Sequence, residues 1–272
     1  MFGTDGVRGV ANRELTPELA LALGRAAGAV LTAERERPRV LVGRDPRTSG
    51  VMLEAALVAG LASAGCEVES LGVVTTPGLA YLVRALGADE AAVVSASHNA
   101  AEYNGIKFFS AQGYKLPDEV EDQIEHGVRS PEGLPRPEGV RVGRIEENAG
   151  AVAAYVDYLT SSVPGGLAGK YLVLDCANGA ASGIAPEVFR RLDAKVRVLA
   201  AEPAGHNIND GCGSLHPERL QQEVLAVGAD AGFAFDGDAD RCIAVDEQGE
   251  LVDGDQALAV LALERMTQGT LP

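Results

Sequence analysis

Tryptophan is absent from the 272-residue sequence, and cysteine and histidine occur only four times each. The cysteines are widely spaced and form no Cys-x-x-Cys pair, which argues against a zinc ribbon or a thioredoxin-like motif and favours a reduced cytoplasm. The amino terminus lacks a basic segment followed by an apolar run, and no run of about eighteen apolar residues occurs. We therefore expect a cytoplasmic protein that is neither secreted nor embedded in a membrane.

Basic residues are also scarce, because 23 lysines and arginines face 39 aspartates and glutamates and leave a net charge of -16. Without a basic stripe, non-specific binding to nucleic acid or to an anionic membrane surface is not expected. A small anionic substrate could still bind in a local basic pocket. The length suits one large domain or two ordinary ones.

Short β-rich runs alternate with helical stretches in the first half of the chain, which favours parallel strands in an α/β fold. Thr16 can cap a helix that has Pro17 in its first turn. The Pro-, Gly- and Arg-rich residues 131–143 predict an exposed connection. The other elements expected here are strands at 39–42, 67–74 and 91–95, an apolar helix ending at Gly65, and a helix at 78–86.

The second half repeats this pattern. A helix is expected at residues 149–159 and a strand at 171–175, followed by a Gly/Ser-rich loop and another helix. The two halves therefore look like weak internal duplicates. Alternating apolar and polar residues around Gln248 and Gly249 predict a hairpin.

The expected fold class is α/β, with two consecutive three-layer α/β/α domains whose sheets are mixed and mostly parallel. We place these domains at residues 1–145 and 146–252. Residues 253–272 would begin a truncated third domain, because the helix expected at 255–266 has no partner downstream.

Three aspartates at alternate positions, Asp236, Asp238 and Asp240, follow an apolar run. Alternate side chains of an extended segment point the same way, so these carboxylates should converge at the end of a buried strand. Each pair about 5 Å apart would repel by roughly 3 kcal/mol at an effective dielectric near 20, so the cluster calls for a bound cation. An all-oxygen ligand set suits magnesium or calcium.

Three other interpretations of this loop are possible. A calcium-binding EF-hand needs glycine at its sixth position, where Arg241 stands, and helices where strands are expected. A haloacid-dehalogenase-type phosphatase would have Thr or Val in place of Asp240 and a lysine downstream, yet none follows Lys195. A solvated acidic turn would leave the carboxylates uncompensated.

The segment Ser97-His98-Asn99 follows the strand expected at 91–95. By itself it is typical of a polar turn. A hydrolase triad is disfavoured, because adjacent side chains diverge and His98 would not reach Ser97, and no Gly-x-Ser-x-Gly elbow is present. A hydroxyl at the carboxyl end of a parallel strand does lie where open α/β sheets bind ligands, so Ser97 could carry a phosphoryl group.

The arginines and histidines differ in the roles that their neighbours indicate. Arg8 lies between glycines that permit close approach to a ligand, and guanidinium suits bidentate phosphate binding. Arg44 with Asp45 is expected to be a structural ion pair. His206 and His216 lie in a turn-rich loop and receive no catalytic role.

Five segments occur together in the order known from one family: FGTDGVRG, SASHNAAEYNGIKFF, DCANGAA, NINDGCGSLHPE and DGDADR. The chain resembles the α-D-phosphohexomutase superfamily of phosphoglucomutases and phosphomannomutases over nearly its whole length. FGTDGVRG and GCGSLHPE resemble the branch that acts on glucosamine phosphates.

The resemblance implies that Ser97 is a phosphoserine and that Asp236, Asp238 and Asp240 hold one Mg²⁺, whose remaining protein ligand is the phosphate on Ser97. It implies reversible conversion of glucosamine 6-phosphate to glucosamine 1-phosphate by phosphoryl transfer. A sugar 1,6-bisphosphate would be both intermediate and activator. Such a phosphosugar would be the main partner, with a homodimer as the candidate assembly.

The resemblance also implies supporting roles for four basic residues. Lys107 and Arg8 would flank the transfer site, giving acid/base help and positioning phosphate. His98 would support catalysis, and Arg241 would help to bind the phosphosugar. Two small departures are Ala100, where many members have proline, and Ala239, where many have glycine.

Members of the family have four domains, so we expect an amino-terminal portion with weak or absent turnover by itself. One alternative is a phosphomannomutase or phosphoglucomutase of the same superfamily. A second is a non-catalytic metal-binding regulatory module.

Overall fold

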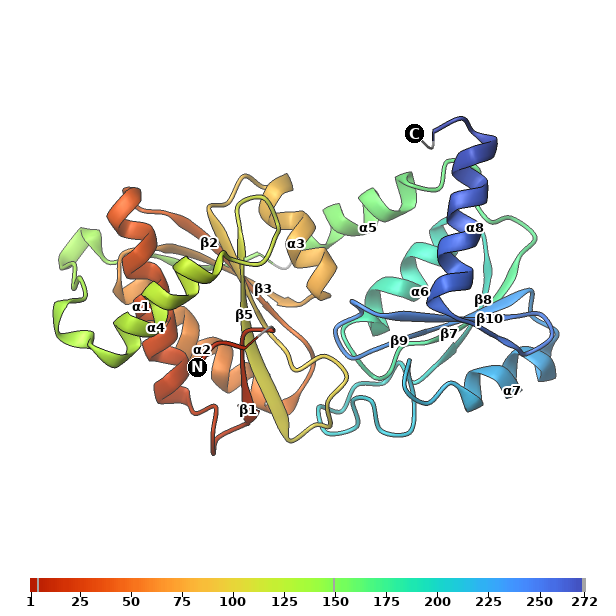
Figure 1. Ribbon diagram of the computed structural model, residues 1–272, viewed down its shortest axis with the longest axis horizontal. Coiled ribbons are helices and arrows are strands. Elements are labelled where there is room, and N and C mark those ends of the chain that lie inside the picture. Colours follow the sequence, from red (N-terminus) through yellow and green to blue (C-terminus); the bar gives the residue numbers. More distant parts are fainter. Residues whose placement is uncertain (4, 149, 271–272) are drawn as a thin grey trace.

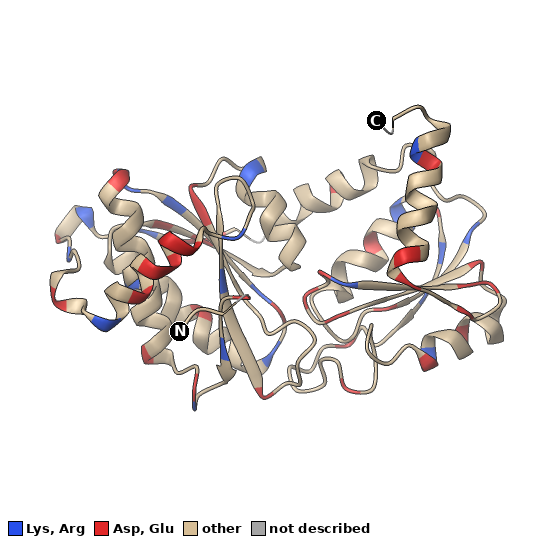
Figure 2. Ribbon diagram, in the orientation of Figure 1, with Lys and Arg blue, Asp and Glu red and all other residues tan. Residues whose placement is uncertain are grey.

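The computed structural model describes residues 1–3, 5–148 and 150–270, and these form two α/β units that lie side by side (Figure 1). Each unit has a mixed sheet with helices on its faces, so the expected pair of α/β/α layers is confirmed. Figure 2 shows acidic residues spread over both units. Among the described residues, no helix combines the length and apolar character needed to cross a bilayer.

The first sheet has six strands in the order β1-β5-β4-β2-β3-β6. The strands β4, β2, β3 and β6 are parallel to one another, whereas β1 and β5 are antiparallel to their neighbours. The last strand crosses the domain limit expected at residue 145, so this sheet continues to Glu147. The strands are β1 (Val7–Val10), β2 (Arg39–Arg44), β3 (Glu67–Val73), β4 (Glu90–Val94), β5 (Tyr103–Ser110) and β6 (Ile145–Glu147).

Helices cover both faces of the first sheet. The oxygen of Thr16 accepts a hydrogen bond from the Leu19 amide, which confirms the predicted cap of α1. One apolar core joins α1, α2 and α4 to one face, and a second joins α3 and α5 to the other. These helices are α1 (Pro17–Glu34), α2 (Thr48–Ser63), α3 (Thr76–Ala85), α4 (Asp118–Arg129) and α5 (Ala151–Ser161). Ala149, where the last of them was expected to begin, lies outside the described residues.

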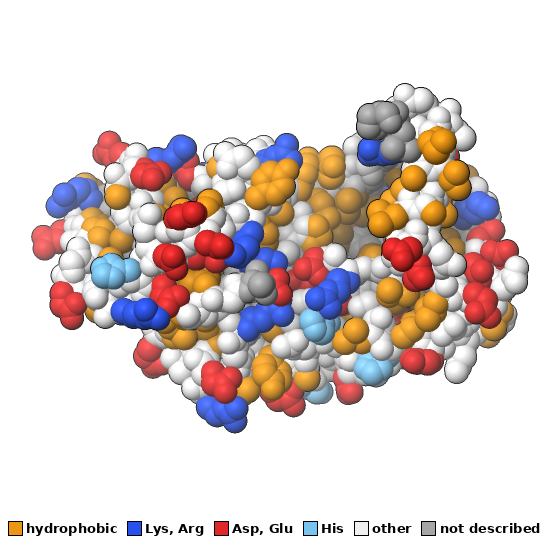
Figure 3. Space-filling view, viewed as in Figure 1, with side chains coloured by type: hydrophobic (Ala, Val, Ile, Leu, Met, Phe, Trp, Pro, Cys, Tyr) orange, Lys and Arg blue, Asp and Glu red, His pale blue; other side chains and the backbone are white. Residues whose placement is uncertain are grey.

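The second sheet has five strands in the order β11-β10-β9-β7-β8, with α6 and α7 on opposite faces. The predicted hairpin is present as β10 and β11. The helix α8 follows, and its large apolar side chains are exposed (Figure 3). The elements are β7 (Tyr171–Asp175), α6 (Ala181–Arg191), β8 (Lys195–Leu199), α7 (Glu218–Val227), β9 (Ala231–Phe235), β10 (Cys242–Asp246), β11 (Leu251–Val252) and α8 (Gly254–Thr267).

The two units are duplicates in topology. The path β2-α2-β3-α3-β4-β5 has the same strand order and directions as β7-α6-β8-α7-β9-β10. Each central strand starts in the same way: Asp89 and Arg39 exchange two hydrogen bonds of 2.8 Å, and Asp230 and Tyr171 exchange bonds of 2.7 and 2.8 Å. The internal repeat predicted from sequence pattern is therefore confirmed, and it extends beyond the segments that revealed it.

Candidate active site at the junction of the two units

The loop after β4 presents Ser97 at the carboxyl end of the first parallel sheet. Ser97 is 1% exposed and has a φ of +52°, a left-handed conformation that disfavours residues with a Cβ. Its amide donates to the Ser95 hydroxyl at 3.0 Å. This conformation turns the Ser97 hydroxyl out of the strand direction and toward the second unit.

The loop after β9 presents the three carboxylates at the equivalent end of the second sheet. Asp236 and Asp238 are buried, Asp240 is exposed, and one oxygen from each lies within 4.8 Å of the others. Gly237 permits the close approach of the two loops, because a Cβ there would lie 2.5 Å from the carbonyl oxygen of Ser97. The convergence predicted from the alternate spacing is thus present.

The hydroxyl and the carboxylates meet across the junction. Ser97 Oγ donates to Asp236 Oδ2 at 2.5 Å, and Thr76 Oγ1 donates to Asp238 Oδ2 at 2.6 Å. The Thr76 amide also donates to the Asp238 carbonyl at 3.0 Å, which docks the acidic loop on the start of α3. Two residues far apart in sequence, Ser97 and Asp236, therefore share one site.

Electrostatics make this site receptive to a cation. Burial, together with the charge of Asp236, raises the pKa of Asp238 to about 6, and burial likewise raises the pKa values of Asp236 and Asp240. Asp238 Oδ1 is buried without a hydrogen-bond partner in the part of the chain that the structure describes. An unpartnered buried oxygen beside two further carboxylates fits a hard divalent cation, so the cluster is a candidate metal site.

Basic side chains lie around the carboxylates. Arg8 on β1 and Lys107 on β5 each approach Asp5 at 3.7 Å, and Arg241 Nε lies 3.9 Å from Asp240. Arg8 Nε is buried, and no acceptor for it occurs among residues 1–3, 5–148 and 150–270. Figure 3 shows Lys and Arg side chains gathered near the middle of this face, where the units meet. Their positive charge could offset that of an anionic ligand.

His98 corrects one expectation. Its Nδ1 lies 3.3 Å from Ser97 Oγ, although adjacent side chains were expected to diverge. The cause is the left-handed φ of Ser97, which replaces the alternation of an extended chain. Burial and the charges of Arg241 and Arg8 lower the pKa of His98, so a neutral imidazole faces the hydroxyl near neutral pH.

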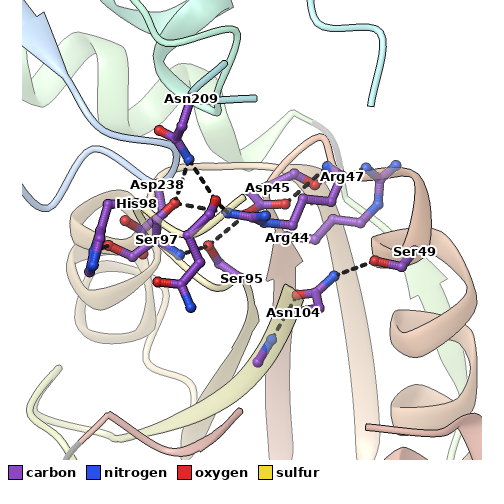
Figure 4. A network of polar contacts seen from close by, with 12 residues as sticks. Arg44, Asp45, Arg47, Ser49, Ser95, Ser97, His98, Asn104, Asn209 and Asp238 are labelled. Carbon is purple, nitrogen blue, oxygen red and sulfur yellow. Dashed lines mark hydrogen bonds and ion pairs between the residues drawn. The ribbon is translucent and has the colours of Figure 1, made fainter. Parts of the chain in front are cut away.

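The expected ion pair of Arg44 with Asp45 is wrong. Arg44 Nε instead binds Glu54 at 2.8 Å, and Asp45 pairs with Arg47 Nε at 2.9 Å in a fully buried contact (Figure 4). The reason is that Arg44, the last residue of β2, reaches Glu54 on α2, whereas the carboxylate of Asp45 faces Arg47 and the Ser95 hydroxyl. His206 and His216 are exposed.

Sequence reasoning missed several residues that hold the site together. Nothing in the sequence pointed to Arg47, Thr76 or Asn209, because their contacts with the site are to main-chain carbonyls of a distant loop or to a residue of the other unit. One departure from the family pattern is explained: Ala239 has a φ of +59°, in the region where glycine is favoured.

A buried hydroxyl, three convergent carboxylates and nearby basic groups at the ends of two α/β units form an arrangement that suits metal-assisted phosphoryl transfer. The family models for phosphoglucomutase/phosphomannomutase α/β/α domains I and II match residues 1–133 and 153–249. The chain belongs to the phosphoglucomutase/phosphomannomutase family.

Curated relatives include the phosphoglucosamine mutases of Moorella thermoacetica and Symbiobacterium thermophilum, each 59% identical over 100% of this chain. The chain spans 62% and 61% of their lengths. Among solved structures, a phosphoglucomutase/phosphomannomutase family protein from Burkholderia thailandensis has a TM-score of 0.83 and 29% identity over 96% of this chain and 58% of its own. A Thermus thermophilus protein assigned as a phosphomannomutase has a TM-score of 0.82 and 31% identity over 99% of this chain and 62% of its own.

Proposed function

We propose that the protein is a phosphoglucosamine mutase that interconverts glucosamine 6-phosphate and glucosamine 1-phosphate. The observation that carries this proposal is the 2.5 Å contact of Ser97 Oγ with Asp236 Oδ2, beside two further carboxylates. The names of the relatives at 59% identity support the choice of sugar.

In the proposed reaction, Ser97 carries a phosphoryl group. The bond from phosphorus to Ser97 Oγ breaks as a bond to the free sugar hydroxyl forms, and the hydroxyl proton leaves to a base. The resulting sugar 1,6-bisphosphate reorients in the site, and its other phosphoryl group is then transferred to Ser97 Oγ. The sugar leaves with its phosphate moved, and the enzyme regains its starting state.

We assign Asp236, Asp238 and Asp240 as the protein ligands of a Mg²⁺ ion. When bound, Mg²⁺ would neutralise charge on the transferring phosphoryl group. Arg8 Nε has no acceptor within the described residues, which suits it to hold a phosphate oxygen, and Lys107 lies on the neighbouring strand for the same task or for proton transfer.

Two further groups receive supporting roles. The low pKa of His98, caused first by burial, leaves its Nδ1 able to accept a proton near Ser97 Oγ. Arg241 lies half exposed at the rim of the carboxylate loop, where its guanidinium could bind the phosphosugar.

The test is transfer of phosphate to the purified chain. We expect incubation with Mg²⁺ and glucosamine 1,6-bisphosphate to add one phosphoryl group that peptide mapping assigns to Ser97. Ser97→Ala should prevent the addition, whereas the matched variant Ser63→Ala, in which a serine at the end of α2 is replaced, should not. Absence of any phosphate on the unmodified chain would contradict the proposal and favour a non-catalytic metal-binding module.

Sugar preference needs a separate comparison. A form of the protein with the four domains expected for the family, phosphorylated on Ser97, would be offered glucosamine 6-phosphate, mannose 6-phosphate or glucose 6-phosphate, and release of phosphate from Ser97 would be followed. We expect glucosamine 6-phosphate to react fastest. Faster reaction with mannose or glucose 6-phosphate would favour a phosphomannomutase or phosphoglucomutase. A cytoplasmic location and a homodimer stay predictions.

A further inference from the structure

The main chain of the Ser97 loop is held from both units. From the first, Arg47 donates to the carbonyl oxygens of Ser97 at 2.9 Å and Asn99 at 2.8 Å, and also to Ala100. From the second, Asn209 Nδ2 donates to the same carbonyls of Ser97 and Asn99, at 2.9 and 3.1 Å. Figure 4 shows Asn209 reaching this loop from above, whereas the guanidinium of Arg47 reaches it from the right.

The hydrogen bonds that Arg47 donates to this loop lie entirely within the first unit. Its guanidinium is fully buried and paired with Asp45, which also accepts the Ser95 hydroxyl at 2.6 Å. Ser95 in turn accepts the Ser97 amide. This network restrains Ser97 from one side, in a left-handed conformation that persists only where surrounding contacts enforce it.

The hydrogen bonds that Asn209 donates to this loop depend on docking of the second unit. Its own amide donates to the Ala177 carbonyl at 2.9 Å, which ties it to the loop after β7. A Cβ on Gly237 would lie 3.0 Å from Asn209 Nδ2, so the amide group packs directly beside the carboxylate loop. Asn209 therefore contacts the Ser97 carbonyl from the same unit that supplies Asp236, Asp238 and Asp240.

We propose that Asn209 is a positioning residue that couples docking of the second unit to the orientation of the Ser97 hydroxyl. This inference rests on the proposed function, because it concerns the same transfer. Asn209 acts through the main chain of Ser97 and Asn99. When the second unit docks, its carboxylates arrive together with the donor that holds the Ser97 peptide in place.

Two substitutions remove the donor with little strain. Asn209 has a φ of +58°, which glycine adopts freely and aspartate tolerates. Asn209→Gly deletes the side chain, and Asn209→Asp keeps its shape but turns an oxygen toward the two carbonyls. The matched control is Gln221→Ala, which removes another side-chain amide bonded to a carbonyl, that of Gly249, within the second unit.

The first measurement is hydrogen–deuterium exchange of the metal-free chain. Exchange in peptides covering residues 95–104 should accelerate about tenfold in Asn209→Gly and at least as much in Asn209→Asp, since the hydrogen bonds of this loop should open more often. Gln221→Ala should leave these peptides unchanged. Unchanged exchange in both Asn209 variants overturns the inference, whether or not the chain accepts phosphate.

The second measurement is the rate of Ser97 phosphorylation by glucosamine 1,6-bisphosphate. A misplaced hydroxyl should lower the rate at saturating bisphosphate about tenfold to a hundredfold, while the half-saturating concentration stays the same. A rate equal to that of the unmodified chain overturns the positioning role even if exchange is faster. Failure of the unmodified chain to be phosphorylated contradicts the proposed function instead, so the two failures are distinguishable.

Discussion

The two units share a scaffold and differ in the chemistry of one loop. Ser97 is the third residue after β4, and Asp238 is the third after β9, so the hydroxyl and the central carboxylate occupy equivalent places in the duplicated topology. Docking the units brings these loops face to face. A repeated fold can therefore build one composite site when its two copies specialise in complementary groups.

The turns after the central strands show the same specialisation. In each, an aspartate carboxylate accepts a hydrogen bond from the main-chain amide two residues later. The Arg47 amide donates to Asp45 at 3.0 Å, and the Ala177 amide donates to Asp175 at 2.9 Å. The second oxygen of Asp45 binds Arg47 and Ser95, whereas Asp175 Oδ2 has no partner within the described part of the chain. Only the turn that supports Ser97 contains a buried ion pair.

Removing that ion pair should have the largest effect of the substitutions that compare the two units. Arg47→Met leaves the Asp45 charge buried and unpaired, so we expect a loss of about 3–5 kcal/mol in the free energy of unfolding. Urea denaturation measures it. At the equivalent place in the other unit, Ala177→Gly should change stability by less than about 1 kcal/mol, because its φ of +54° suits glycine. Equal losses in both variants would contradict the asymmetry.

Replacing the central carboxylate should have two effects of opposite sign. In Asp238→Asn, calorimetry should show Mg²⁺ affinity lower by about a hundredfold. Burial raises the pKa of Asp238 to about 6 from 3.8, so stability of the metal-free chain falls as pH rises through this range. The variant lacks this charge and should be more stable at pH 8 without metal. Unchanged Mg²⁺ affinity would exclude Asp238 as a ligand, and Asp210→Asn is the control.

The first residues of the equivalent strands β4 and β9 also differ, since Glu90 stands opposite Val40 and Ala231 opposite Leu172. Burial raises the pKa of Glu90 to about 8 from 4.5. The folded state then binds the extra proton between these values, so Glu90 should make stability fall as pH rises from about 5 to about 8.

In Glu90→Gln, this contribution should disappear. Relative to the unmodified chain, the free energy of unfolding of the variant should be higher at pH 8 than at pH 5 by roughly 1–3 kcal/mol. Urea denaturation at both pH values measures this difference. The exposed Glu132→Gln is the control. The same pH dependence in Glu90→Gln and the unmodified chain would assign it to other groups.

The smallest effects concern what the units share. Asp89→Ala and Asp230→Ala each remove a carboxylate that accepts the first amide of a central strand, and each should lower the urea denaturation midpoint by a small and similar amount. Similar shifts in denaturation midpoint would sharpen the equivalence of the units. A large loss of stability in one variant and none in the other would show that equivalent contacts do not stabilise the two units equally. The exposed Asp122→Ala should have little effect.

Much of the fold was predictable because its signals are local. The cap at Thr16, the strand at residues 171–175 and the hairpin at Gly249 each depend on short-range pattern, and all are present. Strand ends were less predictable: β2 continues through Arg44, because pairing with β3 and β4 extends it past the apolar run.

In the candidate site, the predicted meeting of Ser97 with the acidic loop is observed, since a strand followed by a special loop is visible in sequence. The roles of Ser97, Arg8, Lys107 and Arg241 stay proposals. What escaped prediction depends on tertiary context. Local pattern says nothing of which carbonyl a distant Asn209 meets, nor of the left-handed φ that brings His98 to its neighbour.

The central claim is that the hydroxyl of one unit and the carboxylates of the other surround a single divalent ion. Crystals of the chain grown with Mn²⁺, which takes the same oxygen ligands as Mg²⁺ and scatters anomalously, test it most directly. We expect one anomalous peak ligated by Asp236, Asp238 and Asp240 and adjacent to Ser97 Oγ. A peak only elsewhere on the protein, or none at this cluster at saturating Mn²⁺, would contradict it.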